Sequence, residues 1–327
     1  MNLLRKFIPS AVALAAGLAA SACVFGQTPS FPSRPIKLIV PYPTGGGTDI
    51  TARAIVKPLS DALGQTVFIE NKPGATGMIG AQNVVSSPAD GYSVLFGAAS
   101  EMAMNASLFK KMSYNPRTDL QPVALVATFP LVFVTAASNT SSFEKILDRA
   151  RQNPGAVAYG SIGYGSPQHL AGELLQMESN AVLTHVPYKG SGPLIQDALA
   201  GHVELAISSL PPAVALVKAG QLRALATTAQ KRSNVLPRVP TMIDLGFSHY
   251  DLSTWVGMAV PAGTPKPVVA RLSEGLAKAL GDKEFREVLL AQGAEPEGST
   301  PEQFRDFIAR EIAKSERIVS QARIQLD

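Results

Sequence analysis

The chain has 327 residues, of which 46% are hydrophobic and 17% are charged, and its formal net charge is +4. This balance is typical of a folded globular protein and excludes a largely disordered one. The positive charge is weak and dispersed, without a basic run, so we expect no nucleic-acid partner. A single cysteine excludes a disulfide within the chain, and the apolar core must therefore provide the stability.

Residues 1–26 are predicted to be a signal peptide. Arg5 and Lys6 form a charged start, an apolar run follows, and small residues at 20–22 provide a cleavage site. No later apolar stretch reaches the roughly 20 residues that span a bilayer, so we expect a periplasmic protein. Cys23 directly follows the small residues, and a lipid anchor on this cysteine is left open beside plain cleavage.

Strands and helices alternate from the start of the mature chain, which favours βαβ units and a mostly parallel sheet. The predicted strands of the first unit are 36–40, 66–71 and 93–98, with a helix from 48 to about 63 ended by Gly64 and another helix within 72–92. The pattern restarts with strands at 130–135, 157–161, 203–209 and 222–228, and with helices at 142–155, capped by Ser142, and from 168 to about 177.

Two α/β units joined by two extended crossings predict two lobes with a cleft between them, each lobe a mixed sheet flanked by helices. Residues 255–265 read as a strand that returns to the first unit, and the last third is helical. We therefore predict lobe 1 over 27–132 and 256–327, and lobe 2 over 133–255. In open α/β sheets ligands lie beyond the carboxyl ends of strands, so the Gly/Ser loops at 44–49, 74–77 and 160–166 should line the cleft.

The first of these loops, in PYPTGGGTDITAR (41–53), places three glycines before a helix. A helix N-terminus offers unpaired N–H groups and a partial positive charge, and glycines let an anion approach closely. A phosphate loop would need Gly-Lys-Ser/Thr or a third spaced glycine, and Asp49 would repel a dianion. A carboxylate fits better, although a tight turn with Asp49 as a helix cap is left open.

Catalysis finds little support in the sequence. The four histidines show no metal-ligand spacing, and no G-x-S-x-G motif is present. His169, one turn into a helix, is a candidate ligand contact or a structural donor, while Trp255 and Tyr188 are candidates for ring stacking or for core packing. We predict no catalytic residue, no metal and no cofactor.

The chain resembles the extracytoplasmic solute receptors of the tripartite tricarboxylate transporter family, also known as Bug-type receptors. The resemblance spans nearly the whole mature chain in the right order. It rests on VPYPTGGGTDITAR, ENKPGATGMIGA, PADGYSVLFG, YGSIGYGSPQHLAGELL, HVPYKGSGPLIQDALAGHVE, GQLRALATT, VPTMIDLG and WVGMAVPAGTP.

The resemblance implies a two-lobed, type II-like periplasmic binding protein that closes on a small carboxylated solute. It implies a first loop that holds one carboxylate, partly through water, and a second lobe that closes over it. Thr44, before the glycines, is a mild departure from the family pattern. Glu101, near the expected pocket edge, matters more: a carboxylate there could repel a dicarboxylate or attract an amino group, and it leaves the ligand type open. The ligand-binding residues that the resemblance implies are Thr44, Gly45, Gly46, Gly47, Thr48, Asp49, Thr76, Gly77, Ser100, Ser161, Gly163, Gly165, Ser166, His169, Tyr188 and Gly190.

The expected partners are a small organic acid and the large and small membrane subunits of the transporter, with the receptor itself a monomer. Two alternatives stay open at this point. The same receptor could serve as a ligand sensor for a membrane signalling protein, and, with less support, the cleft could belong to an exported small-molecule enzyme.

Overall fold

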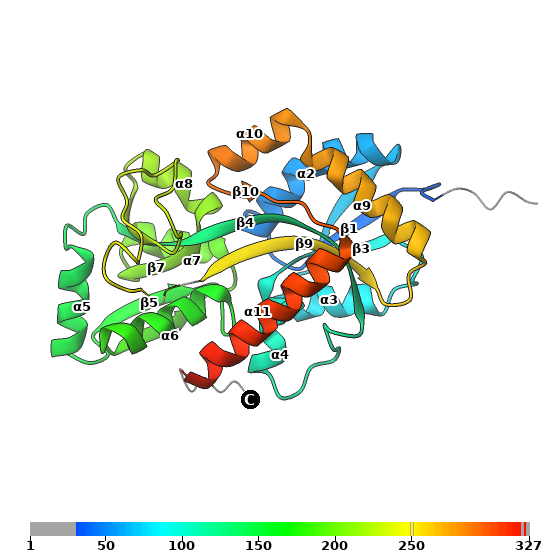
Figure 1. Cartoon of the computed structure of the whole chain (residues 1–327). Coiled ribbons are helices and arrows are strands. Elements are labelled where there is room, and N and C mark those ends of the chain that lie inside the picture. The colour runs from blue at the N-terminus through cyan, green and yellow to red at the C-terminus, as the bar shows by residue number, and fades with distance from the viewer. Residues whose placement is uncertain (1–30, 249, 251, 322–323, 325–327) are drawn as a thin grey trace, which may run out of the picture.

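The computed structural model describes residues 31–248, 250, 252–321 and 324, so the predicted signal peptide and Cys23 lie outside the described residues. Over this part of the chain the strands form one curled sheet in the order β2-β1-β3-β9-β4-β7-β5-β6, and β10 and β8 both pair with β4. Figure 1 shows helices on both faces of the sheet and two lobes that two long strands connect.

Lobe 1 contains the parallel strands β1, β2 and β3, followed in the chain by helices that return across the sheet. Its C-terminal helices come from the far end of the chain and cover the same half of the sheet (Figure 1). The elements are β1 (Ile36–Val40), α2 (Gly47–Leu63), β2 (Val67–Asn71), η1 (Ala75–Gly77), α3 (Met78–Val85), β3 (Ser93–Ala98), η2 (Ser100–Met104), α4 (Asn105–Leu108), α9 (Lys266–Leu280), α10 (Lys283–Ala291), β10 (Glu295–Pro296) and α11 (Pro301–Gln321).

Lobe 2 contains a second parallel set, in which β5 lies between β6 and β7. Because each of these strands is followed by a helix, three helix N-termini lie at the carboxyl edge of this half of the sheet. The elements are α5 (Phe143–Gln152), β5 (Val157–Ser161), α6 (Pro167–Ser179), β6 (Leu183–Pro187), α7 (Ser191–Ala200), β7 (Leu205–Ser209), α8 (Leu210–Lys218) and β8 (Leu222–Thr227).

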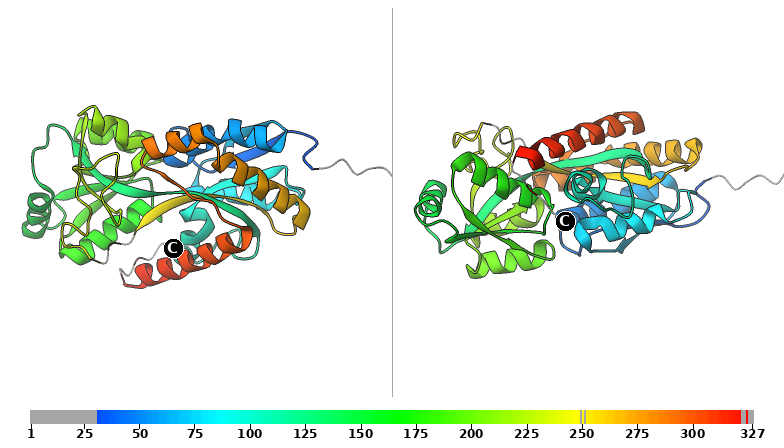
Figure 2. Two further views of the ribbon diagram at one scale, coloured as in Figure 1. Left: turned by 45° about the horizontal axis from the view of Figure 1, so that its top comes forward. Right: turned by 90° about the horizontal axis from the view of Figure 1, so that it is seen from below.

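Strands β4 (Leu120–Ala136) and β9 (Ser253–Pro261) cross between the lobes and pair antiparallel along most of their length. Pro130 forms the last β9 pair, and Leu131 is the first residue of β4 to pair with β7. A proline has no N–H to give to a ladder, so it suits the point where the partner strand changes. The two views of Figure 2 show the lobes at the two ends of this crossing.

Helix α11 lies across the outside of the crossing strands, and its buried face packs on η2, α4 and β4. Trp255 in β9 is fully buried against it, with ring contacts to Phe304 and Phe307 and a 3.1 Å hydrogen bond from Nε1 to Glu311 Oε2. Of the two roles that the sequence leaves open for Trp255, the structure therefore shows core packing at the crossing.

The expected α/β fold is confirmed, and strands 36–40, 93–98 and 157–161 have the predicted bounds. Gly64 ends α2 in the left-handed conformation, and Ser142 caps α5, both as predicted. The predicted lobe boundaries, at 132/133 and 255/256, fall inside β4 and β9. No helix in the described part of the chain combines the length and apolar character needed to cross a membrane.

Candidate functional site

A small cavity lies between the lobes, at the carboxyl ends of their parallel strands. Its volume is about 30 Å³, which is room for about two water molecules. Lobe 1 contributes Tyr42, Pro43, Gly46, Gly47, Thr48, Ala98 and Ser100, the crossing strands contribute Phe129 and Thr254, and lobe 2 contributes Ile162, Pro167, Gln168, Gly190, Ser191 and Ser209.

Four helices of at least nine residues begin at this cavity: α2 from lobe 1 and α6, α7 and α8 from lobe 2. Helices α2, α7 and α8 have no side-chain cap: no side chain of the N-cap residue (Gly46, Gly190 or Ser209) accepts a hydrogen bond from the N–H groups of the first turn. Each N-terminus carries a partial charge of roughly +0.5, and the four together form a positive environment. No Asp, Glu, Lys, Arg or His from the described residues lines the cavity.

The first glycine loop is divided between the cavity and its support. Gly46, Gly47 and Thr48 line the cavity, and nothing among the described residues accepts a hydrogen bond from their N–H groups. Gly45 and Thr44 do not line it. The N–H of Gly45 donates to Asp49 Oδ2 at 2.9 Å, and Thr44 is exposed. Of the predicted anion loop 44–49, only Gly46, Gly47 and Thr48 therefore line the cavity.

Asp49 is buried beneath this loop and does not line the cavity. Arg53 Nε donates to its carboxylate at 2.8 Å, and Asn71 Nδ2 donates at 2.9 Å. Burial alone would raise the pKa of Asp49, but the hydrogen bonds from Arg53, Asn71 and Gly45 outweigh it and hold that pKa below its usual value. Asp49 is thus an ionised brace for the loop, and it does not cap the helix as the sequence leaves open, because its carboxylate accepts from Gly45, Arg53 and Asn71 and not from the N–H groups of the first helical turn.

Glu101 lies behind the lobe 1 wall of the cavity and is fully buried. Tyr42, which lines the cavity, donates its hydroxyl to Oε2 at 2.7 Å, and the N–H of Ala98 donates to Oε1. Burial raises the pKa of Glu101 to about 7, against the lowering effect of these hydrogen bonds. The carboxyl group therefore lies close to the cavity, behind its wall and not among its lining residues.

Thr76 and Gly77 do not line the cavity, and Thr76 forms a contact between the lobes. Thr76 Oγ1 donates to the carbonyl of Tyr164 in lobe 2 at 2.8 Å, and Asn105 Nδ2 donates to the carbonyl of Thr76 at 3.0 Å. Both residues of the turn have positive φ, and Gly77 packs against the Glu101 carboxylate so closely that a Cβ would lie 2.5 Å from Oε2. Only glycine fits there.

The hydroxyls of Ser161 and Ser166, expected as ligand donors, are used inside their own loop. Both donate to the carbonyl of Gly163, Ser166 Oγ also accepts from the N–H of His169, and the N–H of Gly165 donates to His169 Nδ1. The five predicted residues of this loop therefore hold its conformation and do not line the cavity; they are Ser161, Gly163, Gly165, Ser166 and His169. The loop reaches the cavity instead through Ile162, Pro167 and Gln168.

Beneath this loop Ser161 Oγ lies 2.7 Å from His185 Nε2, a serine–histidine pair that sequence reasoning missed. His185 also stacks on His169 at 4.3 Å between ring centroids. Burial, with His169 beside it, lowers the pKa of His185 to about 3, and its Nδ1 has no hydrogen-bond partner among the described residues. Such an imidazole is a weak base, and without an orienting acid the pair resembles a structural contact more than a nucleophile.

Tyr188 and Gly190, from the turn before α7, have different positions. Gly190 lines the cavity, whereas Tyr188 donates its hydroxyl to Asp197 Oδ2 at 2.8 Å and packs beside Gly160. Of the sixteen predicted site residues, the cavity therefore brings together Gly46, Gly47, Thr48, Ser100 and Gly190. Three of the lining residues that were missed directly follow a predicted one: Ile162 follows Ser161, Pro167 follows Ser166 and Ser191 follows Gly190.

Two lobes, a crossing pair of strands and a cleft at helix N-termini define the class of periplasmic binding proteins. The sequence profile described as "Tripartite tricarboxylate transporter family receptor" matches residues 51–324, and the chain belongs to this family. The resemblance stated from the sequence is thereby confirmed, and the chain is related to solute-binding receptors.

Three relatives illustrate the match. Protein BugT of Bordetella pertussis is 37% identical over 329 residues, which covers 100% of both chains. Among solved structures, R. palustris Rpa4515 with adipate is 36% identical, with a TM-score of 0.86 over 89% of this chain and 98% of its own. MatC from Rhodopseudomonas palustris with bound malate is 29% identical, with a TM-score of 0.83 over 88% of this chain and 100% of its own.

Proposed function

We propose that the mature protein is a periplasmic receptor that binds a small carboxylate-bearing solute in the cavity between its lobes. The receptor delivers this solute to the large and small membrane subunits of a tripartite tricarboxylate-type transporter, and it acts as a monomer. The observation that supports this most is the cavity wall, in which four helix N-termini meet and no charged side chain of the described residues takes part. The adipate and malate bound by two related structures suggest the ligand class.

The donor set favours a carboxylate over a phosphate. A phosphate dianion is commonly matched by Arg or Lys side chains, whereas amide and hydroxyl groups are enough for a flat monoanion. The N–H groups of Gly46, Gly47 and Thr48 with the hydroxyls of Ser100, Ser191 and Ser209 make up such a set. Each hydrogen bond to a charged group contributes roughly 1.5–3 kcal/mol, so a few of them account for micromolar affinity, about 8 kcal/mol.

Ligand entry requires the lobes to separate. Sites for small molecules usually measure about 300–1,000 Å³, far more than the 30 Å³ between the closed lobes here. We propose that lobe 1 (27–132 and 256–327) and lobe 2 (133–255) rotate about β4 and β9 and close on the solute. The Thr76–Tyr164 hydrogen bond would then be broken in the open form and made in the closed form.

A thermal-unfolding panel of organic acids tests the function. A carboxylate at about 100 times its Kd should add about 2.7 kcal/mol to the free energy of unfolding, because it binds only the folded protein. Adipate, malate, citrate and glutamate form the first panel, and dimethyl adipate, which has no carboxylate, is the matched control. Product formation is followed in the same samples. A panel without any stabilising acid, or one in which an acid is turned over, contradicts the proposal.

A further inference from the structure

We propose that this receptor takes up one proton when it binds its carboxylate ligand, and that Glu101 carries that proton. The inference rests on the proposed function and deepens it. It starts from an unusual feature of the described residues, a fully buried carboxyl group with no cationic partner, directly behind the wall of an anion-binding cavity.

The surroundings of Glu101 give its negative charge little support. Its carboxylate oxygens accept from Tyr42 Oη and from the N–H of Ala98, and the Tyr114 hydroxyl donates to its backbone carbonyl at 2.6 Å. The elements packed most closely on η2 are β3, η1, α3, α4 and α11. The first four contain no titratable side chain, and the buried face of α11 contains none. Tyr42 and Tyr114 are thus the titratable groups that face Glu101.

Tyr42 links this carboxyl group to the cavity. When Glu101 is ionised, the Tyr42 hydroxyl donates its proton to Oε2 and has no donor left for a ligand. When Glu101 is protonated, its own O–H can donate to Tyr42 Oη, and the tyrosine hydroxyl can then turn its proton toward a carboxylate in the cavity. The neutral form of Glu101 therefore adds a donor to the site and also removes a like charge beside the ligand.

Two unpaired side chains at the same cavity indicate that it is built for a polar ligand. Ser100 and Gln168 line the cavity and are only 1% and 3% exposed. Ser100 Oγ and Gln168 Oε1 are nevertheless without a hydrogen-bond partner among the described residues. Ser100 directly precedes Glu101 in η2. A ligand in hydrogen-bond reach of Ser100 would thus lie close enough to Glu101 for the two charges to interact.

The direction of the pH effect follows from linkage. Burial raises the pKa of Glu101 to about 7, so it is largely neutral at pH 6 and ionised at pH 8.5, and a bound anion raises this pKa further. Carboxylic ligands, with pKa values of about 4 to 5, are largely ionised throughout this window. His169 and His185, with pKa values lowered by burial to about 4 and about 3, stay neutral. Affinity should therefore fall with rising pH, by up to about tenfold per pH unit above pH 7.

Isothermal titration calorimetry with adipate and with malate tests the inference at pH 6.0, 7.0 and 8.0. Measurements in two buffers of different ionisation enthalpy give the number of protons taken up, expected to be about one per ligand at pH 8. Glu101→Gln, a permanently neutral replacement, should bind at both ends of the range with no proton uptake. Asp61→Asn is the matched control, because it removes one negative charge from an exposed ion pair with Lys57 and should behave like the natural protein.

The outcomes separate the two proposals. Tight, pH-independent binding by the natural protein overturns the role of Glu101 and leaves the receptor function intact. Proton uptake that persists in Glu101→Gln has the same consequence. Absence of binding of every acid of the panel, by both the natural protein and Glu101→Gln and at every pH, overturns the receptor function and this inference with it. A melting curve for Glu101→Gln checks its fold, and the proton count of the natural protein needs no variant.

Discussion

Gly46→Glu abolishes carboxylate binding, with a loss of at least about 100-fold in affinity, and leaves the protein folded. A hundredfold loss corresponds to about 2.7 kcal/mol. Gly46 is the N-cap of α2, with φ −76° and ψ 163°, a conformation open to any residue, and a Cβ there would meet only Ser191 Oγ at 3.6 Å and the Pro43 carbonyl at 3.7 Å. The longer side chain would enter the cavity, where its carboxylate competes with the ligand for the same N–H groups. Calorimetry with a stabilising acid measures the loss.

Two replacements at the same position separate charge from volume. Glutamine has nearly the same size as glutamate but no charge, so Gly46→Gln should bind the ligand about ten times more tightly than Gly46→Glu. The affinity of Gly46→Ala should stay within a few-fold of that of the natural protein. The unfolding free energy of all three should fall by no more than about 2 kcal/mol, since glycine ranks above alanine as an N-cap residue and loss of a favourable N-cap residue costs about 0.5–2 kcal/mol. Binding by Gly46→Glu at natural affinity would show that the loop is not the anion site.

Gly47→Val holds the lobes apart and weakens binding by about 100-fold, while the free protein stays folded. A Cβ at Gly47 would lie 2.8 Å from Ser209 Oγ in lobe 2 and 3.4 Å from Phe129, and the two methyl groups of valine extend further. Overpacking of this kind costs about 1–3 kcal/mol. The contact with Ser209 falls on the closed form alone, whereas Phe129 lies in the same lobe as Gly47 and its looser contact is present in both forms. Small-angle X-ray scattering should show no compaction on ligand addition, alongside the calorimetric loss of affinity.

Gly192→Val is the matched control, because Gly192 also lies in the first turn of a helix and a Cβ there meets nothing within 4 Å. It should compact and bind like the natural protein. Gly47→Ala should have a smaller effect than Gly47→Val, and Ser209→Ala should relieve it, because the Ser209 Oγ is the atom that the alanine Cβ meets. A Gly47→Val protein that still compacts and binds with natural affinity would rule out closure at this contact.

Much of the fold follows from local patterns. Strands 36–40, 93–98 and 157–161 are apolar runs bounded by glycine, proline or serine, and the structure keeps their bounds. Strand β6 was missed because Leu183–Pro187 is an edge strand with a half-exposed histidine and a proline, which gives no clear alternation. Helix α8 was missed because its two prolines read as a loop, although proline is tolerated in a first turn.

The length of β4 could not be read from local sequence. Only 130–135 was predicted as a strand, yet β4 begins at Leu120 because the distant β9 and β10 supply its pairing partners. Pro122 interrupts the expected pattern, and the structure places it at a register shift, where a missing N–H is tolerated. Local periodicity carries no information on pairing between residues more than a hundred positions apart.

The site was predicted only in part, because some of its residues are brought together by contacts that are distant in the sequence. Gly46, Gly47 and Thr48 were identifiable because glycines before a helix have a local signature, and the structure places all three at the cavity. Ser209 was not identifiable, because its importance depends on which surface of lobe 1 faces it. The roles of Ser161 and Ser166 were mistaken, because their carbonyl acceptor and the His185 ring are fixed only by the folded loop.

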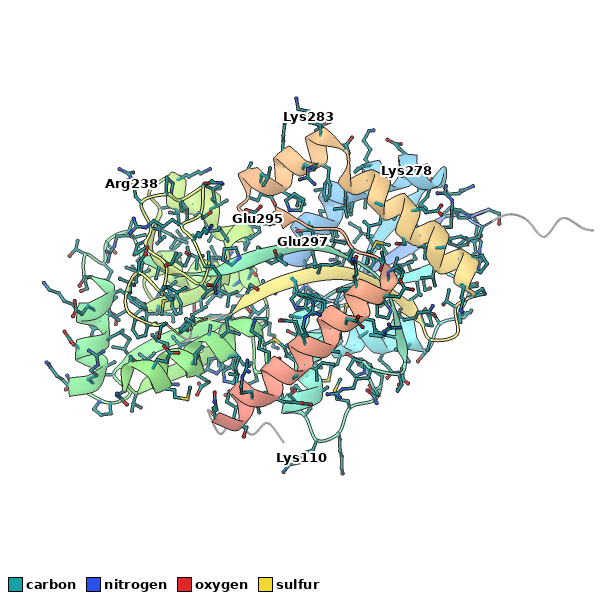
Figure 3. All side chains as sticks on the ribbon, in the orientation of Figure 1. Lys110, Arg238, Lys278, Lys283, Glu295 and Glu297 are labelled. Atoms are coloured by element: carbon teal, nitrogen blue, oxygen red, sulfur yellow. The ribbon has the colours of Figure 1, made fainter. Side chains whose placement is uncertain are left out.

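The charged surface also contrasts with the cavity. Figure 3 labels Lys110, Arg238, Lys278 and Lys283, which point outward from the periphery of the lobes, and Glu295 and Glu297 on the segment around β10. None of these residues lines the cavity. We therefore expect an organic acid to be held by main-chain and hydroxyl donors of a cavity wall without charged side chains, and not by the charged side chains of the outer surface.

Amide resonances measured on protein labelled with ¹⁵N-glycine test this account most directly. Titration with an acid that stabilises the protein should shift the Gly46 and Gly47 signals strongly, as their N–H groups gain a carboxylate acceptor, while Gly64 and Gly281 at distant helix ends stay in place. The Gly46→Ala and Gly47→Ala variants assign the two signals. An acid that binds while both signals keep their positions would contradict the central claim.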